Sequence, residues 1–331
     1  MSPSKIRCIT GGKVVALVVG FLFLGMTGVV AGREQEPRLR IDPAEHTASA
    51  HTAMILAAAR AGARLVAVGA HGVVLLSDDG GKSFHQARFV PVSSTLTGVV
   101  FVGARRGWAV GQWGVILATD DGGETWRLQR SDIKVDRPLF SVYFRNAKEG
   151  WAVGLWSLML HTTDGGASWT RVTLPPPPGH LKADRNLYQI FADSAGTLYI
   201  ACESGFVLRS ADDGANWTYL ATGYHGSLWT GVALANQVIL VGGLRGHIYR
   251  STDRGTRWVR VGSPYDSSIT DMVQIGQNTI EAVALNGVSL VSHDDGLTFV
   301  GTQREDRLDL TAAVDSQANR AVVFSMNGPI G

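Results

Sequence analysis

One short motif recurs six times along the chain and constrains its fold more than any other feature. Its pattern is Ser/Thr-x-Asp-x-Gly-x-x-aromatic, as in residues 119–126, and its aspartates are separated by 42, 43, 48, 41 and 41 residues. Six copies at so regular a spacing indicate a chain built from one repeated structural unit. The motif aspartates are Asp79, Asp121, Asp164, Asp212, Asp253 and Asp294.

Each repeat contains four short runs of strand-forming residues. In the second repeat they cover residues 97–102, 107–111, 115–118 and 126–128, punctuated by Gly and Asp. The third repeat has the same order, and no amphipathic helical pattern follows residue 62. Four strands in a period of about 41–43 residues are typical of a propeller blade. The sequence therefore predicts an all-β propeller of four-stranded blades.

The end of the chain bears on the number of blades. Residues 310–331 repeat only the first half of a unit, and half a blade would leave an unpaired strand edge, which closed propellers avoid. The stretch Arg38–Ile41 could supply the missing outer strand. We therefore expect seven blades closed by strands from both termini, with six blades as the alternative. The 48-residue interval is explained by Pro175–Pro178, a stiff loop between the third and fourth units.

The motif itself has a structural explanation. A carboxylate can accept backbone N–H groups inside a tight turn, while the Gly supplies a position with positive φ. The aromatic residue would then open the outermost strand and pack its ring against the neighbouring blade. Catalysis or calcium binding by these aspartates is the alternative, but turns in six different blades cannot converge on one ligand. We therefore interpret the six aspartates as structural.

The N-terminus is typical of an export signal. Lys5, Arg7 and Lys13 precede or open an apolar run over residues 14–30, and small residues offer a cleavage site after Ala31. The apolar run is slightly long, so an uncleaved membrane anchor is the alternative. We expect an exported protein, in the periplasm or an equivalent extracytoplasmic space. Residues 1–31 would be the signal peptide or anchor, 32–50 an N-terminal segment and 51–331 the propeller.

Charge and cysteine content exclude several classes of protein. The chain has 30 Lys and Arg against 28 Asp and Glu, a formal net charge of +2. Residues 1–31 hold three of the cations and no acid, so the remainder has 27 against 28, or −1. Nucleic acid as a general partner therefore loses its support. Two cysteines exclude a disulfide framework, and we expect Cys202 to be a buried small hydrophobe.

Two of the repeats resemble a known family. Residues 107–117 read Gly-Trp-Ala-Val-Gly-Gln-Trp-Gly-Val-Ile-Leu and run into residues 119–126, and residues 150–160 run likewise into residues 162–169. This pattern resembles the photosystem II stability/assembly factor family, although Ser157 stands where the family has Gly. The resemblance implies an exported seven-bladed propeller that helps to assemble or protect a membrane complex without catalysing a reaction. Related sequences also occur in bacteria without photosystems, so a role in photosynthesis does not follow automatically.

The loops carry residue types that suit a binding surface. In a four-stranded blade, the loop between strands two and three opens on the same face as the connection between blades. Arg, Trp and Tyr, which anchor many protein interfaces, gather in these loops. We expect a membrane protein or a membrane-associated complex as the partner, with a solvated rim as the structural alternative. The candidate partner-binding residues are Trp113, Trp156, Arg245, Arg130, Arg137, Arg185 and Tyr224, and the alternative surface on the opposite face is formed by Arg105 and Arg106.

A sialidase-like glycoside hydrolase is the rival function, because such enzymes carry the same aspartate motif. They also need an arginine trio, a Tyr nucleophile and an acid Asp, and the Phe/Tyr-Arg-Ile-Pro segment that normally supplies the first arginine does not occur in this sequence. The nine His show no ligand pair at the usual metal spacing. We therefore expect no catalytic residue, no metal and no cofactor. A carbohydrate- or peptide-binding propeller is a variant that the sequence does not separate from an assembly factor.

Overall fold

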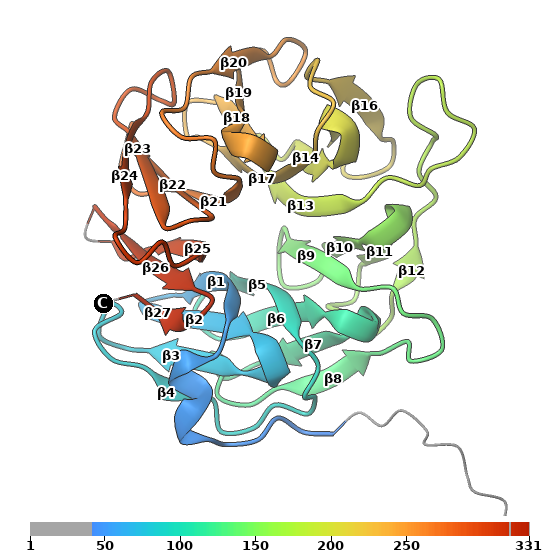
Figure 1. Cartoon of the computed structure of the whole chain (residues 1–331). Helices are drawn as coiled ribbons and strands as arrows, with labels where there is room; N and C mark the ends of the chain where they lie inside the picture. Colours follow the sequence, from blue (N-terminus) through green and yellow to red (C-terminus); the bar gives the residue numbers. More distant parts are fainter. Residues whose placement is uncertain (1–41, 318, 331) are drawn as a thin grey trace, which may run out of the picture. The chain divides into compact units, whose positions relative to one another are not determined.

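The repeated apolar runs form seven antiparallel sheets arranged in a ring, which is a seven-bladed β-propeller (Figure 1). The computed structural model describes residues 42–317 and 319–330, all within the unit Leu39–Gly331. The expected export signal (residues 1–31) and the expected closing strand (Arg38–Ile41) lie outside the described residues. No helix in the described part of the chain is both long and apolar enough to cross a membrane.

Six blades contain four strands each, and the seventh contains three among the described residues. Within a blade the strands follow one another in chain order, and the first strand lines the centre of the ring. The first three blades are β1 (Ile55–Ala61), β2 (Arg64–Gly69), β3 (Val74–Ser77) and β4 (His85–Gln86); β5 (Leu96–Val102), β6 (Arg106–Gly111), β7 (Ile116–Thr119) and β8 (Arg127–Arg130); and β9 (Leu139–Phe144), β10 (Gly150–Gly154), β11 (Met159–Thr162) and β12 (Thr170–Arg171).

The remaining four blades repeat this arrangement. They are β13 (Leu187–Ala192), β14 (Leu198–Cys202), β15 (Phe206–Ser210) and β16 (Thr218–Ala221); β17 (Leu228–Ala233), β18 (Ile239–Gly243), β19 (Ile248–Ser251) and β20 (Val259–Val261); β21 (Ile269–Gln274), β22 (Ile280–Ala284), β23 (Val288–Ser292) and β24 (Val300–Gln303); and β25 (Leu310–Asp315), β26 (Ala321–Ser325) and β27 (Gly328–Pro329).

The ring closes between the last blade and the first. Each inner strand contacts the inner strand of the next blade, and β25 contacts β1. The prediction of seven blades is therefore confirmed, and the alternative of six is wrong. On the outer side of the seventh blade, the short 3₁₀ helix η1 (Ala48–Thr52) lies against β27. The backbone carbonyl of His51 approaches Gly328 so closely that a Cβ at Gly328 would clash with it.

The hydrophobic core lies between the blades. Between the first two blades, Val66 and Leu76 pack with Leu117 and Trp126, all of them buried. Every other pair of neighbouring blades, including the seventh and the first, shares a cluster of the same kind. Because burial of apolar surface is the main favourable term in folding, each blade is stabilised chiefly by its two neighbours. The inner strands are therefore held in fixed positions around the centre.

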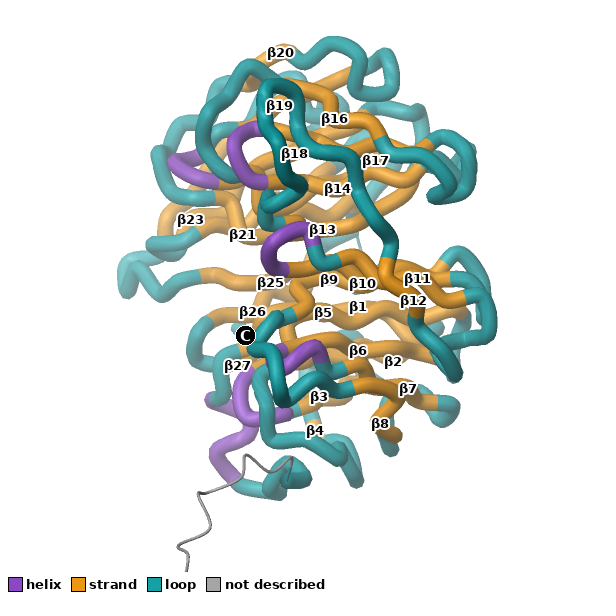
Figure 2. The backbone as a smooth tube through the Cα atoms, turned by 90° about the vertical axis from the view of Figure 1, so that its right-hand side faces the viewer, coloured by secondary structure: helices purple, strands orange, loops and turns teal. Residues whose placement is uncertain are grey.

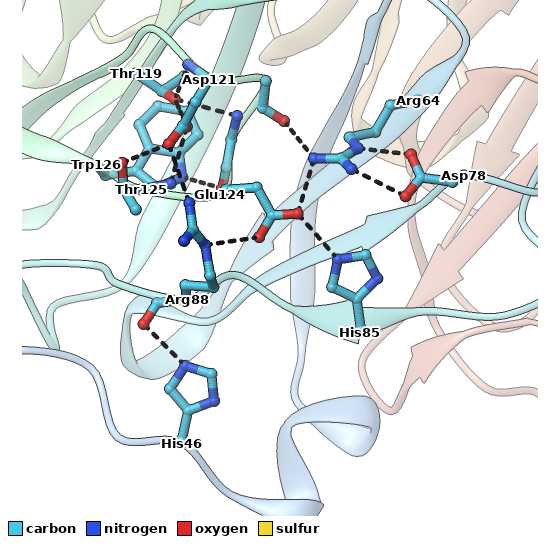
Figure 3. A network of polar contacts seen from close by, with 12 residues as sticks. His46, Arg64, Asp78, His85, Arg88, Thr119, Asp121, Glu124, Thr125 and Trp126 are labelled. Atoms are coloured by element: carbon cyan, nitrogen blue, oxygen red, sulfur yellow. Dashed lines mark hydrogen bonds and ion pairs between the residues drawn. The ribbon is translucent and has the colours of Figure 1, made fainter.

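The aspartate of the motif is held inside its own turn, as the second copy shows (Figure 3). Asp121 Oδ1 accepts hydrogen bonds from Thr119 Oγ1 at 2.8 Å and from the Thr125 N–H at 2.9 Å, and its Oδ2 accepts from Thr125 Oγ1 at 2.6 Å. Gly123 has a φ of 91°, which a residue with a Cβ rarely adopts. Trp126 lies one residue before β8 and donates from Nε1 to the Gly123 carbonyl at 2.8 Å. These contacts give the carboxylate a role in shaping the turn.

An ion-pair network joins the first two blades beside this turn (Figure 3). Arg64 on β2 contacts Asp78 at 2.7 Å and Glu124 of the second blade at 3.1 Å. Arg88, in the connection between these blades, contacts Glu124 and Asp121 at 3.7 Å each. Glu124 therefore connects the motif turn of the second blade to Arg64 of the first blade and to Arg88 between the two blades.

Candidate functional site

Short turns between the second and third strands have an unusual backbone conformation. Their central residues have φ between 52° and 61°, the left-handed region that favours Gly. Side chains at such positions often belong to functional surfaces, because the surrounding structure must hold the strain. Five of the turns are η2 (Ala70–Gly72), η3 (Gln112–Gly114), η4 (Leu155–Ser157), η5 (Glu203–Gly205) and η6 (Leu244–Gly246). Their central residues, with that of the sixth blade, are His71, Trp113, Trp156, Ser204, Arg245 and Asn286.

Hydrogen bonds place these turns beside the connections between blades. The N–H of Gln112 donates to the Thr95 carbonyl at 3.0 Å, and the N–H of Leu155 donates to the Pro138 carbonyl at 3.1 Å. Equivalent bonds occur in the five other blades. In the side view the turns gather toward one face of the propeller (Figure 2). We call this face, made of the turns and the blade connections, the turn face.

The two tryptophans of the turn face have different environments. Trp156 is 54% exposed, and its backbone N–H donates to Asn186 Oδ1 at 3.1 Å. Trp113 packs against the core cluster between the first two blades, and its carbonyl accepts from the Asp132 N–H at 2.7 Å. Trp156 is therefore available to a partner, whereas Trp113 also stabilises the blade interface.

A cavity of about 470 Å³ lies where the connection between the second and third blades meets the third blade. Arg130 is already engaged there, since its Nη1 donates to the Gly114 carbonyl at 2.7 Å and its Nη2 lies 3.4 Å from Asp132. Among the described residues, the side chains of Arg137 and Arg171 form no hydrogen bond or ion pair, although both line the cavity. The cavity thus presents two unpaired guanidinium groups beside apolar and aromatic surface. Its lining residues are Arg130, Asp132, Val135, Arg137, Leu158, Leu160, Trp169 and Arg171.

Three further candidates belong to the turn face, and their side chains differ in how far contacts within the protein engage them. The Arg185 guanidinium lies 2.7 Å from the His180 ring and 3.6 Å from Asp184. Tyr224 donates to the Leu244 carbonyl at 3.0 Å and stacks on a neighbouring histidine ring, so it mainly stabilises η6. Burial raises the pKa of its hydroxyl above the usual value. Arg245 is exposed, and only its backbone N–H is engaged.

The alternative arginines lie beside the motif turns. Arg105 Nε donates to the Asp120 carbonyl at 3.1 Å, and the Arg105 carbonyl accepts from the Gly122 N–H at 2.9 Å. Arg106 contacts the Asp120 carboxylate at 3.2 Å and lies over the Trp108 ring at 5.8 Å. These two cations are therefore partly satisfied within the protein, unlike Arg137.

The structure adds residues that the sequence did not single out. Trp169 and Arg171 join the cavity of Arg137, because β12 and the residue before it lie beside a connection that is more than thirty residues away in the sequence. The centre of the ring is lined by side chains from the inner strands, including Tyr188 and Asp271. Tyr188 is the second residue of β13, and Asp271 is the third residue of β21. A comparison of equivalent positions in the repeated inner strands could therefore have identified both from the sequence.

No metal site emerges within the described residues, where no group of three His, Cys, Asp or Glu side chains could hold an ion. Cys202 is fully buried in the cluster between the third and fourth blades. Burial raises the pKa of its thiol to about 12, so the thiolate is not formed at neutral pH.

Part of the chain matches the model of a known protein family. The family model of the photosynthesis system II assembly factor YCF48 matches residues 86–236, somewhat less than half of the chain. The resemblance to the photosystem II assembly-factor family is confirmed. The matched residues include Trp113, Trp156, Arg130 and Arg137 but not Arg245.

Solved structures of this family share the fold. A structure described as YCF48 bound to D1 peptide superposes with a TM-score of 0.69 at 17% identity, covering 88% of this chain and 98% of that chain. YCF48 from Cyanidioschyzon merolae superposes with a TM-score of 0.67 at 16% identity, covering 84% of this chain and 95% of that one. No curated protein matches the chain. At these identities the likeness establishes the propeller, and the site must be argued from this chain's own residues.

Proposed function

We propose that the protein is an exported, non-enzymatic docking factor that binds a segment of a membrane protein through its turn face. The observation that carries the proposal is the family match over residues 86–236, since these residues build the cavity of Arg137 and Arg171. A solved relative is described as bound to a D1 peptide, so a propeller of this family can hold a peptide segment. Export rests on the N-terminal sequence and is part of the proposal.

The chemistry of the turn face suits such a segment. Unpaired guanidinium groups donate forked hydrogen bonds to carboxylates, and the exposed Trp156 offers a large rigid surface for apolar side chains. Because the turns are fixed by hydrogen bonds to neighbouring connections, little conformational entropy is lost when a partner binds. The expected partner segment therefore carries acidic residues next to apolar ones.

The test is co-purification of the tagged protein from detergent-solubilised membranes. The diagnostic variant combines Trp156→Ala with Arg137→Ala, since neither side chain forms a hydrogen bond or ion pair with another described residue. Arg105→Ala is the matched control on the opposite face. Trp113 is left unchanged, because its removal would also weaken the core between two blades.

We expect the wild type and Arg105→Ala to retain one membrane partner that the double variant loses. Retention by the double variant and loss by Arg105→Ala would assign binding to the opposite face. If no membrane protein co-purifies with the wild type, the docking function itself is wrong.

A further inference from the structure

A second cavity lies on the axis of the propeller. Its volume is about 300 Å³, and residues from all seven inner strands line it. In every blade the register between the first two strands shifts by one residue near the start of the inner strand, as between Leu187 and Gln189. Such an irregularity re-aims the side chain that it contains. The second residue of six of the inner strands consequently lines the axial cavity.

Three of these second residues are aromatic and come from consecutive blades. They are Phe140 on β9, Tyr188 on β13 and Trp229 on β17. The rings of Phe140 and Tyr188 stack with their centroids 5.8 Å apart and an interplanar angle of 14°. All three are only partly buried, so part of each ring is left free at the cavity. The faces of such rings attract cations, and their surface covers alkyl chains.

The next blade contributes the one charged residue that lines this cavity, Asp271 on β21. Its Oδ1 accepts from the Met272 N–H at 2.9 Å, and its Oδ2 accepts from the Ala313 N–H at 3.0 Å. The hydroxyl of Thr230 lies 3.4 Å from Oδ1. A carboxylate can accept about four hydrogen bonds, so Asp271, which lines the cavity, keeps acceptor capacity beyond these contacts.

Among the described residues, no cation forms an ion pair with this carboxylate. The residues that line the axial cavity, all of them described, include no Lys, Arg or His. Three other charged groups lie on the elements packed against β21. Glu281 of β22 accepts from Ser289 and Ala321, Asp315 of β25 accepts from Gln317, and Arg245 of η6 is exposed. Tyr188 is the other titratable group of the cavity. Burial raises the pKa of Asp271 to about 6, in keeping with a desolvated carboxylate that lacks a positive partner.

We propose that the axial cavity binds a primary ammonium group carried on an alkyl chain. The ammonium donates to Asp271, and the alkyl stem packs against Phe140, Tyr188 and Trp229. An alkylammonium fits better than a neutral alcohol of the same length, because only the cation compensates the carboxylate and interacts with the ring faces. A free amine and a lysine side chain of a polypeptide share this chemistry. This site is separate from the turn-face cavity and does not depend on the proposed docking function.

The test is calorimetric titration of the full chain at pH 7.5 with n-butylamine, and with 1-butanol as the neutral control. We expect the amine to bind at least tenfold more tightly than the alcohol, and the Asp271→Asn variant to lose this preference. Lowering the pH from 7.5 to 5 should weaken amine binding to the wild type about tenfold, because the carboxylate becomes protonated near pH 6. A purely structural role of Asp271 would not produce this pH dependence.

Two further arms keep the test decisive. If Asp271→Asn does not fold, as judged by circular dichroism, the Trp229→Leu variant is used in its place. This variant keeps Asp271, and we expect it to bind n-butylamine more weakly than the wild type does. The source of the ammonium group is tested with the peptide acetyl-Gly-Lys-Gly-amide, and its norleucine analogue is the neutral control. If the lysine peptide binds more tightly than n-butylamine, the ligand is a polypeptide; if the two bind equally, the ligand is a free amine. Equal binding of amine and alcohol, or no amine binding at millimolar concentration, would overturn the proposal.

Discussion

Replacing Asp121 with Ala tests how the motif turn contributes to stability. The substitution removes three acceptor contacts, from Thr119 Oγ1, the Thr125 N–H and Thr125 Oγ1, at 2.6–2.9 Å. A hydrogen bond to a charged group contributes about 1.5–3 kcal/mol. The Asp121 side chain is 31% exposed, so water replaces part of this contribution. We therefore expect a loss of about 2–3 kcal/mol in the free energy of unfolding, since the freed donors stay within reach of solvent.

The assay is thermal unfolding followed by circular dichroism, with the adjacent carboxylate as control. A loss of this size lowers Tm by about 4–8 °C in a domain of this size class. Asp120 contacts Arg106 at 3.2 Å and Arg127 at 3.1 Å but is 56% exposed, so Asp120→Ala should cost less than about 1 kcal/mol. If both variants lower Tm equally, or Asp121→Ala leaves it unchanged, the structural account of the motif is refuted.

Three further predictions concern burial, backbone conformation and pH. In a Cys8→Ser chain, Cys202 should resist dithionitrobenzoate at pH 8 until the protein is denatured, and labelling of the native protein would contradict its burial. Gly205→Ala should lower Tm by several degrees more than Gly80→Ala does. Both glycines have positive φ, but of the two only Gly205 has a carbonyl, that of Tyr224, where a Cβ would clash. Equal Tm values for the two variants would argue against this reasoning. Hydrogen bonds from the side chain and the backbone N–H of Ser168 lower the pKa of Asp164 to about 2. This contribution to stability is present above about pH 4 and is lost as pH falls toward 2. Asp164→Asn should therefore flatten the acid limb of a circular dichroism titration, and an unchanged limb would refute the assignment.

The blades could be predicted from the sequence because their signals are local. The run over residues 107–111 becomes β6 with one residue added, and the turn after Thr119 forms where its Asp and Gly predict. Seven blades followed from counting the half-unit at the end of the chain, since closure leaves no other place for it.

The candidate binding surface was harder to predict because it depends on neighbouring blades. Trp113 and Trp156 occupy the same position of their repeats, yet one packs into an interface and the other is exposed. Arg137 stays unpaired while Arg130 binds a carbonyl, and nothing in their local sequence distinguishes them. Asp271 lines the axial cavity next to a shift in strand register, and a periodic apolar pattern reveals neither the shift nor the cavity.

Site-specific photocrosslinking tests the docking account most directly. Benzoylphenylalanine replaces Trp156 on the turn face in one sample and Arg105 on the opposite face in another, and each protein is irradiated with intact membranes. The account predicts a discrete adduct with a membrane protein from position 156 and none from position 105. An adduct from position 105 alone, or none from either position, would contradict it.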